Sequence, residues 1–272
     1  MFLPYGKQSI DASDVRATTR VLRSDWLTQG PNVASFERAV AAYCGVPYAV
    51  AVCNGTAALH IAYLASGLGA HDEVITTPNT FVATTNMLLA IGAKPVFCDI
   101  RLDTYNIDEE KIEALITAKT KAIVPVHFAA HPCAMKKILA IAKRHHLLVI
   151  EDACHALGAR YAGRSIGSFG DLTIFSFHPV KSITTGEGGA IVTDSKKYYE
   201  KMLLFRNHGI TKDPKKLFKK NNPAWYHEMQ DLGFNYRITD IQAALGVSQM
   251  RKLDMFMQKR RAAALRYQKE LK

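Results

Sequence analysis

The segment from Ser176 to Gly189, which reads SFHPVKSITTGEGG, holds the residues with the clearest chemical potential. It contains one lysine, Lys181, between the end of an apolar run and a glycine-rich turn. Glycines let the backbone approach a ligand closely. A lysine that loses its proton there can form a Schiff base with an aldehyde. A surface lysine beside a hairpin turn is the alternative, so the segment needs support from other motifs.

A second candidate is the acidic pair Glu151 and Asp152, which closes an apolar strand-like run. A carboxylate buried at a strand end is costly without a partner. A pyridinium nitrogen would be such a partner, because the carboxylate keeps it protonated and strengthens the ring as an electron sink. The alternative is an acid at a helix N-terminus, which the helix dipole favours. We prefer this alternative for Glu151 and let the other motifs decide for Asp152.

Two further turns could contact a planar, phosphorylated ligand. The sequence from Asn54 to Ala57 is a small-residue turn that opens a helix, and its backbone N–H groups suit a phosphate. Thr56 as a simple helix N-cap is the alternative. Phe81 follows a strand-like run and could stack on a ring, although most phenylalanines belong to the core.

Other patterns do not indicate a site. Gly67 and Gly69 lie in a sequence that lacks the third glycine of the dinucleotide fingerprint and that follows a helix. Ser176, His178 and Asp152 do not form a nucleophile elbow. The ten histidines show no HExxH spacing, so we expect no metal site.

Strand-like and helix-like segments alternate along the chain. This order predicts an α/β fold with a mostly parallel sheet covered by helices on both faces. Ligands bind at the carboxyl ends of strands in such sheets, and the polar clusters follow strands in that way. The predicted strands are 48–52, 73–76, 94–98, 122–126, 147–150, 172–176 and 189–193, and the predicted helices include 11–22, 57–65, 135–145 and 240–272.

Composition excludes several classes of protein. The 272 residues are 48% hydrophobic and 22% charged, which is typical of a globular protein. Charged residues interrupt the apolar runs, and the first nine residues lack a basic flank before an apolar core. We therefore expect neither a membrane span nor a signal peptide. Five scattered cysteines without a CxxC favour a reducing cytoplasm over disulfides or zinc.

The formal charge of +11 comes from one part of the chain. Residues 195–272 hold 18 Lys and Arg against 7 Asp and Glu, whereas residues 1–194 hold 17 of each class. Such a segment can bind nucleic acid or a phosphate-bearing ligand, or it can be a solvated face or a contact for an acidic partner. We favour the last two, because no aromatic-interleaved binding motif accompanies the lysines.

The order of the motifs is more specific than any one of them. A phosphate turn, an aromatic residue, a strand-end Asp and then a lysine resemble the DegT/DnrJ/EryC1/StrS sugar aminotransferases. These are fold-type I pyridoxal-phosphate enzymes, whose large domain has a mostly parallel, seven-stranded sheet. The branch of pseudaminic acid biosynthesis is the most similar one. The matching stretches are 27–31, 54–60, 78–81, 151–155, 176–181, 186–189 and 233–240 for the family, with 4–10, 24–31 and 206–210 for the branch.

The resemblance implies a role for each matching residue. Lys181 would hold pyridoxal 5'-phosphate as a Schiff base and move the proton between substrate and cofactor. Asp152 would pair with the pyridinium nitrogen, and Phe81 would stack on the ring. Asn235 would reach the phosphate of the neighbouring subunit, which implies a homodimer with shared active sites. The remaining implied contacts are Gly55, Thr56, Ala57 and Ser176 for the phosphate, His155 near the ring oxygen, and Arg237 for the substrate.

The resemblance also implies a reaction. Glutamate would donate an amino group, and C4 of a UDP-linked 4-keto-6-deoxy-N-acetylhexosamine would receive it. Related sugar 3-dehydratases carry a histidine in place of the lysine, so Lys181 favours transamination. The implied protein is cytoplasmic and binds neither nucleic acid nor membrane.

The implied domain organisation leaves an alternative open. Residues 1–240 would form the pyridoxal-phosphate-binding large domain with its N-terminal segment. Residues 241–272 would be a helix that leads into a truncated small C-terminal domain, because relatives run roughly one hundred residues longer. A truncated, non-catalytic remnant that at most binds the cofactor or other subunits is the alternative. A phosphate- or nucleic-acid-binding module would rest on the basic segment alone.

Overall fold

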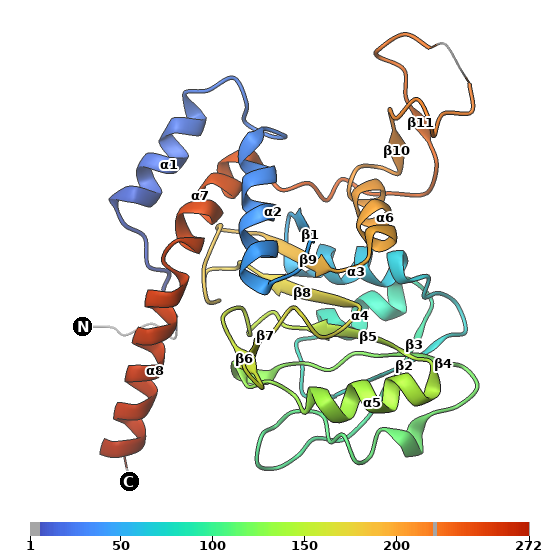
Figure 1. The fold of residues 1–272 in the computed structure, drawn as a ribbon, viewed down its shortest axis with the longest axis vertical. Coiled ribbons are helices and arrows are strands. Elements are labelled where there is room, and N and C mark those ends of the chain that lie inside the picture. Colours follow the sequence, from blue (N-terminus) through green and yellow to red (C-terminus); the bar gives the residue numbers. More distant parts are fainter. Residues whose placement is uncertain (1–5, 220–221, 272) are drawn as a thin grey trace.

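The computed structural model describes residues 6–219 and 222–271. Its main feature is a seven-stranded sheet in the order β1-β9-β8-β5-β4-β2-β3 (Figure 1). Only β9 runs antiparallel to its neighbours, so the prediction of a mostly parallel sheet is confirmed. The strands are β1 (Tyr48–Val52), β2 (Glu73–Thr76), β3 (Lys94–Phe97), β4 (Thr120–Ile123), β5 (Leu148–Asp152), β8 (Leu172–Ser176) and β9 (Gly189–Thr193).

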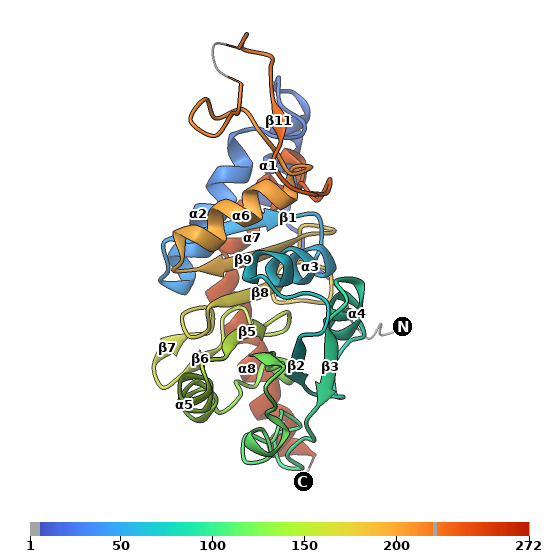
Figure 2. The same ribbon diagram turned by 90° about the vertical axis from the view of Figure 1, so that its right-hand side faces the viewer.

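Helices cover both faces of this sheet. Successive residues of a strand point to opposite faces. Val50 and Val52 of β1 accordingly pack in one core cluster with α3 (Gly55–Ser66), α4 (Ala83–Ala90) and α6 (Lys196–Arg206). Ala49 and Ala51 pack in another cluster with α2 (Pro31–Cys44). A third cluster holds α5 (Met135–His145) against β5, on the same side as α2 (Figure 2).

Two helices, α2 and α6, are absent from the sequence-based assignment. Both carry ordinary boundary signals. Pro31 is the first residue of α2, and Gly45 ends that helix in the left-handed conformation, at φ 75°. The Ser195 hydroxyl caps α6 by accepting a hydrogen bond from the backbone N–H of Tyr198. These signals were sufficient to predict both helices.

Helices α1 (Ala12–Leu22), α7 (Asp240–Met250) and α8 (Leu253–Glu270) lie along one side of the molecule (Figure 1). The sequence predicts one helix over 240–272. The structure is helical there, but a turn at Arg251 and Lys252 divides the segment into α7 and α8. Leu253 is buried there, and the Lys252 ammonium reaches the carboxylates of Asp11 and Asp14. Contacts with α1 therefore divide the helix, although the sequence holds neither Gly nor Pro at this point.

The remaining elements are short. The strands β10 (Ile210–Thr211) and β11 (Glu228–Met229) pair in a hairpin that extends away from the sheet (Figure 1). A second hairpin joins β6 (Arg160–Tyr161) to β7 (Arg164–Ser165), and 3-10 turns occur at Glu113–Leu115 and Phe128–Ala130. Among the described helices, we find none with the length and apolar character that crossing a bilayer requires.

Candidate active site

A cavity of about 540 Å³ lies where the chain leaves the carboxyl ends of β1, β5 and β8. This is the edge of the sheet at which the sequence predicts a ligand. The cavity brings together side chains from segments more than one hundred residues apart. The sequence-predicted residues that line it are Gly55, Thr56, Phe81, Asp152, His155, Ser176 and Lys181.

The turn after β1 presents the N-terminus of α3 to the cavity. The Asn54 side chain caps this helix by accepting a hydrogen bond from the Ala57 backbone N–H at 2.8 Å. The N-cap interpretation of Thr56 is therefore wrong, because α3 already begins at Gly55. Ala57 is buried and does not line the cavity, so its predicted phosphate contact stays a prediction.

Small residues allow β1, β8 and β9 to converge beside this turn. A Cβ atom at Gly55 would lie 3.1 Å from Cβ of Ser176, which is close for such a contact. A Cβ atom at Gly189 would lie 2.5 Å from the carbonyl oxygen of Asn54, which no side chain tolerates. The glycine-rich turn is thus needed for close backbone packing. That packing brings Ser176 next to the N-terminus of α3, where the helix dipole favours an anion.

Asp152 lies at the end of β5 and is 5% exposed. Its Oδ2 accepts a hydrogen bond of 2.7 Å from the Thr84 hydroxyl, and its Oδ1 accepts one of 3.2 Å from the backbone N–H of Cys154. The Thr80 hydroxyl lies 2.7 Å from that of Thr84. Because the Thr84 proton is directed at Asp152, Thr80 donates to Thr84. The carboxylate is thus oriented by a chain of two hydroxyls.

Sequence reasoning missed Thr80 and Thr84, although both line the cavity. Thr80 lies before α4 begins and Thr84 lies within it, so a helical spacing of the two threonines does not indicate their shared site. Their connection with Asp152 could not have been found from spacing, because 68 residues separate Thr84 from Asp152.

Glu151 has a different role from the predicted one. It belongs to β5, and no helix begins after it, so it is not an acid at a helix N-terminus. It points away from Asp152 and is fully buried. Its carboxylate accepts hydrogen bonds from His127 Nε2 at 2.9 Å, the Thr173 hydroxyl at 2.7 Å and the Gly170 backbone N–H at 2.8 Å.

The ring of His127 has a defined tautomer in this arrangement. The backbone N–H of Cys133 donates to Nδ1 at 3.0 Å, so the ring proton lies on Nε2 and is donated to Glu151. Burial by itself raises the pKa of Glu151, but the bonds from His127, Thr173 and Gly170 together hold the pKa below its ordinary value. Glu151 is therefore a buried carboxylate that supports β5.

Lys181 lies half-buried on the turn after β8. Its backbone N–H donates to the carbonyl of His178 at 2.9 Å, and its carbonyl accepts from Nη2 of Arg260 on α8 at 2.8 Å. These contacts fix the backbone from which the lysine side chain reaches the cavity.

His155 and Phe81 also line this cavity. Burial first, and then the charge of Lys181, lowers the pKa of His155, so its ring is neutral at pH 7. Phe81 is 73% exposed on the cavity wall.

Asn235 and Arg237 do not line the cavity of their own chain. Asn235 is exposed and forms a β-bridge with Asn207, while Nη1 of Arg237 donates to Oδ1 of Asn207 at 2.8 Å. The roles predicted for both residues stay predictions. Within the described part of the chain, no group of three or more His, Cys, Asp or Glu side chains is arranged to hold a metal ion.

The side chains of the cavity match one kind of ligand. Backbone N–H groups and hydroxyls at Gly55, Thr56 and Ser176 suit a phosphate, and the oriented carboxylate of Asp152 suits a protonated ring nitrogen. The amine of Lys181 suits an aldehyde. The set therefore fits pyridoxal phosphate.

Comparison with known proteins agrees with this set. The profile of the DegT/DnrJ/EryC1/StrS aminotransferase family matches residues 8–272. The chain is 44% identical over 271 residues to UDP-4-amino-4,6-dideoxy-N-acetyl-beta-L-altrosamine transaminase of Campylobacter jejuni, covering 98% of this chain and 69% of that protein. It resembles Helicobacter pylori PseC, an aminotransferase of pseudoaminic acid biosynthesis, with a TM-score of 0.92, 40% identity, and coverage of 99% and 70%.

A third relative has been solved with the cofactor. The pyridoxal-phosphate form of Spr1654 of Streptococcus pneumoniae, which is described as a sugar aminotransferase, superposes with a TM-score of 0.91 at 29% identity. The match covers 99% of this chain and 71% of that one.

Proposed function

The chain belongs to the DegT/DnrJ/EryC1/StrS aminotransferase family, and we propose that it moves an amino group from glutamate to C4 of a UDP-linked 4-keto-6-deoxy-N-acetylhexosamine. The convergence of Lys181 and Asp152 on one cavity is the observation that carries this proposal. The names of the Campylobacter and Helicobacter relatives support a sugar of the pseudaminic acid pathway.

Pyridoxal phosphate, when bound, supplies the electron sink for the reaction. Gly55, Thr56 and Ser176 would hold its phosphate, and Phe81 and His155 would lie at its ring. A carboxylate oxygen of Asp152 would accept a hydrogen bond from the protonated ring nitrogen and keep that nitrogen protonated. His155 would lie near the ring oxygen, and its lowered pKa keeps its ring neutral there.

Lys181 has two tasks in this proposal. Its Nζ atom would hold the aldehyde of the cofactor. Once the amino group of the donor has displaced Nζ, the free amine would act as the base that takes the proton from the substrate carbon and as the acid that returns it. The bonds of its backbone to His178 and Arg260 hold the turn that carries this side chain at the edge of the cavity. A homodimer, with Asn235 contacting the cofactor phosphate of the other subunit, completes the proposal. The exposed position of Asn235 supports such a contact.

An amino-transfer assay tests the substrates. The cofactor-loaded protein is incubated with glutamate and the UDP-4-keto sugar, and 2-oxoglutarate and the amino sugar are measured. We expect equal amounts of both. Two control reactions are run in parallel, one without the sugar and one without the glutamate. Amino-sugar formation that does not depend on glutamate would contradict the donor, and glutamate consumption without amino sugar would contradict the acceptor.

Replacing Thr84 by valine is expected to weaken cofactor binding roughly tenfold. Valine has nearly the same shape, but it removes the hydroxyl that donates to Oδ2 of Asp152. A hydrogen bond to a charged group contributes about 1.5–3 kcal/mol. Absorbance titration with pyridoxal phosphate gives the dissociation constant. Thr84→Ser should bind like the natural chain. The neighbouring Thr85→Val is the matched control, since Thr85 donates only to the carbonyl of Val82. A Thr84→Val variant with unchanged affinity would show that the hydroxyl does not matter.

A further inference from the structure

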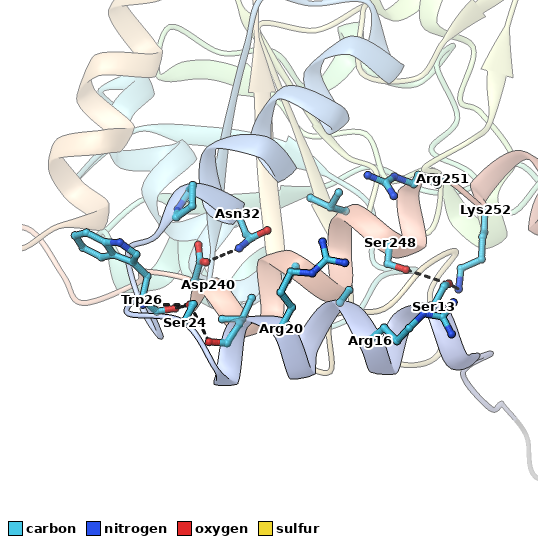
Figure 3. Close-up of a pocket in the computed structure, with 15 residues that line it drawn as sticks. Ser13, Arg16, Arg20, Ser24, Trp26, Asn32, Asp240, Ser248, Arg251 and Lys252 are labelled. Carbon is cyan, nitrogen blue, oxygen red and sulfur yellow. Dashed lines mark hydrogen bonds between the residues drawn. The ribbon is translucent and has the colours of Figure 1, made fainter.

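A second cavity, of about 550 Å³, lies between α1, α2 and α7 (Figure 3). We call it the α1–α7 cleft. It shares no lining residue with the candidate active site. Its lining includes the small or aliphatic side chains of Ala17, Val21, Ala244 and Val247. The full lining is Ser13, Arg16, Ala17, Arg20, Val21, Ser24, Trp26, Pro31, Asn32, Asp240, Ala244, Val247, Ser248, Arg251 and Lys252.

Three arginines around this cleft have no acidic partner among the described residues. Figure 3 shows Arg16 and Arg20 on α1 and Arg251 at the end of α7. No hydrogen bond or ion pair of their guanidinium groups occurs within residues 6–219 and 222–271. Arg16 and Arg20 are one helical turn apart, about 6 Å along the axis. Helix C-termini favour the charges of Arg20 and Arg251, because these lie in the last turn of α1 and at the C-cap of α7.

The acidic residues near the cleft are already engaged. Asp240 is fully buried, and its carboxylate accepts from the Asn32 amide at 2.6 Å and the Val33 backbone N–H at 3.1 Å. Asp11 and Asp14 bind the ammonium of Lys252. Within the part of the chain that the structure describes, no carboxylate contacts the three arginines, because Asp240, the acidic residue of the lining, is hydrogen-bonded to Asn32 and Val33 instead. Guanidinium groups bind phosphate oxygens in a two-pronged geometry, which makes phosphate a better match than an isolated carboxylate.

The other end of the cleft carries an aromatic ring. Trp26 is 57% exposed on the wall, with Pro31 and the amide of Asn32 beside it. Stacking on an aromatic ring contributes about 1–3 kcal/mol for a nucleic-acid base. We propose that the α1–α7 cleft binds a nucleoside diphosphate, with its phosphates at Arg16, Arg20 and Arg251 and its base against Trp26. This site is separate from the proposed catalytic function and does not depend on it.

The two tryptophans of the chain, Trp26 and Trp225, give a site-specific test. Trp225 is 72% exposed, and Trp225→Phe leaves Trp26 as the only reporter. Titration of this cofactor-loaded variant with UDP is expected to change the fluorescence of Trp26 with a saturable curve. Inorganic pyrophosphate should bind about tenfold more weakly, because it lacks the base. A Trp26→Phe variant, which keeps Trp225, should give no response.

Substitution of the arginines locates the phosphates. In the single-tryptophan background, Arg20→Gln and Arg251→Gln are each expected to weaken UDP binding about tenfold. Arg23→Gln is the matched control, because Arg23 follows the same helix but does not line the cleft. The cofactor absorbance should stay unchanged in all three variants. The proposal is overturned if Trp26 does not respond to millimolar UDP, or if both arginine variants bind UDP as the control does. Equal affinity for UDP and pyrophosphate would overturn the placement of the base.

Discussion

Lys181→Ala is expected to abolish both the covalent capture of pyridoxal phosphate and the transfer of the amino group. Alanine at this position leaves the cavity without an amine that can react with the aldehyde or carry the proton. General acid–base catalysis alone contributes about 10²–10⁴-fold to a rate. Amino transfer should therefore fall by at least that factor, even if the variant still binds the cofactor through the residues that would hold the phosphate and the ring nitrogen.

Absorption spectroscopy with borohydride reduction measures the covalent part of this prediction. The natural chain should show a visible band with pyridoxal phosphate, and reduction should leave a stable adduct that peptide mass mapping places on Lys181. The variant should show neither the band nor the adduct. Lys197→Ala, an exposed change on α6, is the control and should behave like the natural chain. Transamination retained by Lys181→Ala, or an adduct on another lysine, would rule out the assignment.

The sequence predicts those parts of the site that are formed by short motifs of neighbouring residues. A lysine before a glycine-rich turn, a small-residue turn before a helix and an acid at a strand end are all local patterns. The fold places most of them around one cavity, because parallel strands end at the same edge of the sheet. The alternating strands and helices predict the layered α/β fold for the same reason, since each apolar run is a buried strand or one side of a helix.

The parts that the sequence does not predict depend on contacts between distant segments. Glu151 and Asp152 are adjacent, and nothing in their spacing tells which one faces the cavity. The answer comes from His127 and Thr173, which lie on segments next to β5 and accommodate the Glu151 side chain. The break between α7 and α8 likewise results from contacts of Lys252 with α1. Local propensity contains no information about either event.

The buried carboxylate of Glu151 leads to the largest expected effect on stability. Glu151→Ala removes the acceptor for His127, Thr173 and the Gly170 backbone N–H, and leaves three buried donors without a partner. Loss of such a buried charged group costs about 3–5 kcal/mol. For a domain of this size, 1 kcal/mol lowers the melting temperature by about 2–4 °C. The variant should thus melt roughly 10 °C below the natural chain in calorimetry.

The pH dependence of this loss separates the carboxylate from simple packing. The pKa of Glu151 is lower in the folded chain than its ordinary value of 4.5, so the folded state favours the ionised form. The stabilisation is complete above the unfolded pKa and disappears as the pH falls through the folded pKa. The difference between Glu151→Ala and the natural chain should therefore be largest at neutral pH and shrink below pH 4.5. Glu110→Ala, which removes an exposed ion pair with Lys137, should cost less than about 1 kcal/mol.

The Glu151→Ala substitution is also expected to affect the active site, because His127 links Glu151 to Asp152. His127 donates through its ring to Glu151 and through its backbone N–H to the carbonyl of Asp152, at 3.1 Å. Loss of the Glu151 carboxylate releases the ring and so loosens the strand end that presents Asp152 to the cavity. Glu151→Ala should accordingly weaken cofactor binding as well as lower the melting temperature. A variant that melts at the lower temperature but binds pyridoxal phosphate normally would show that Thr84 and Cys154 hold the Asp152 carboxylate in place without this support.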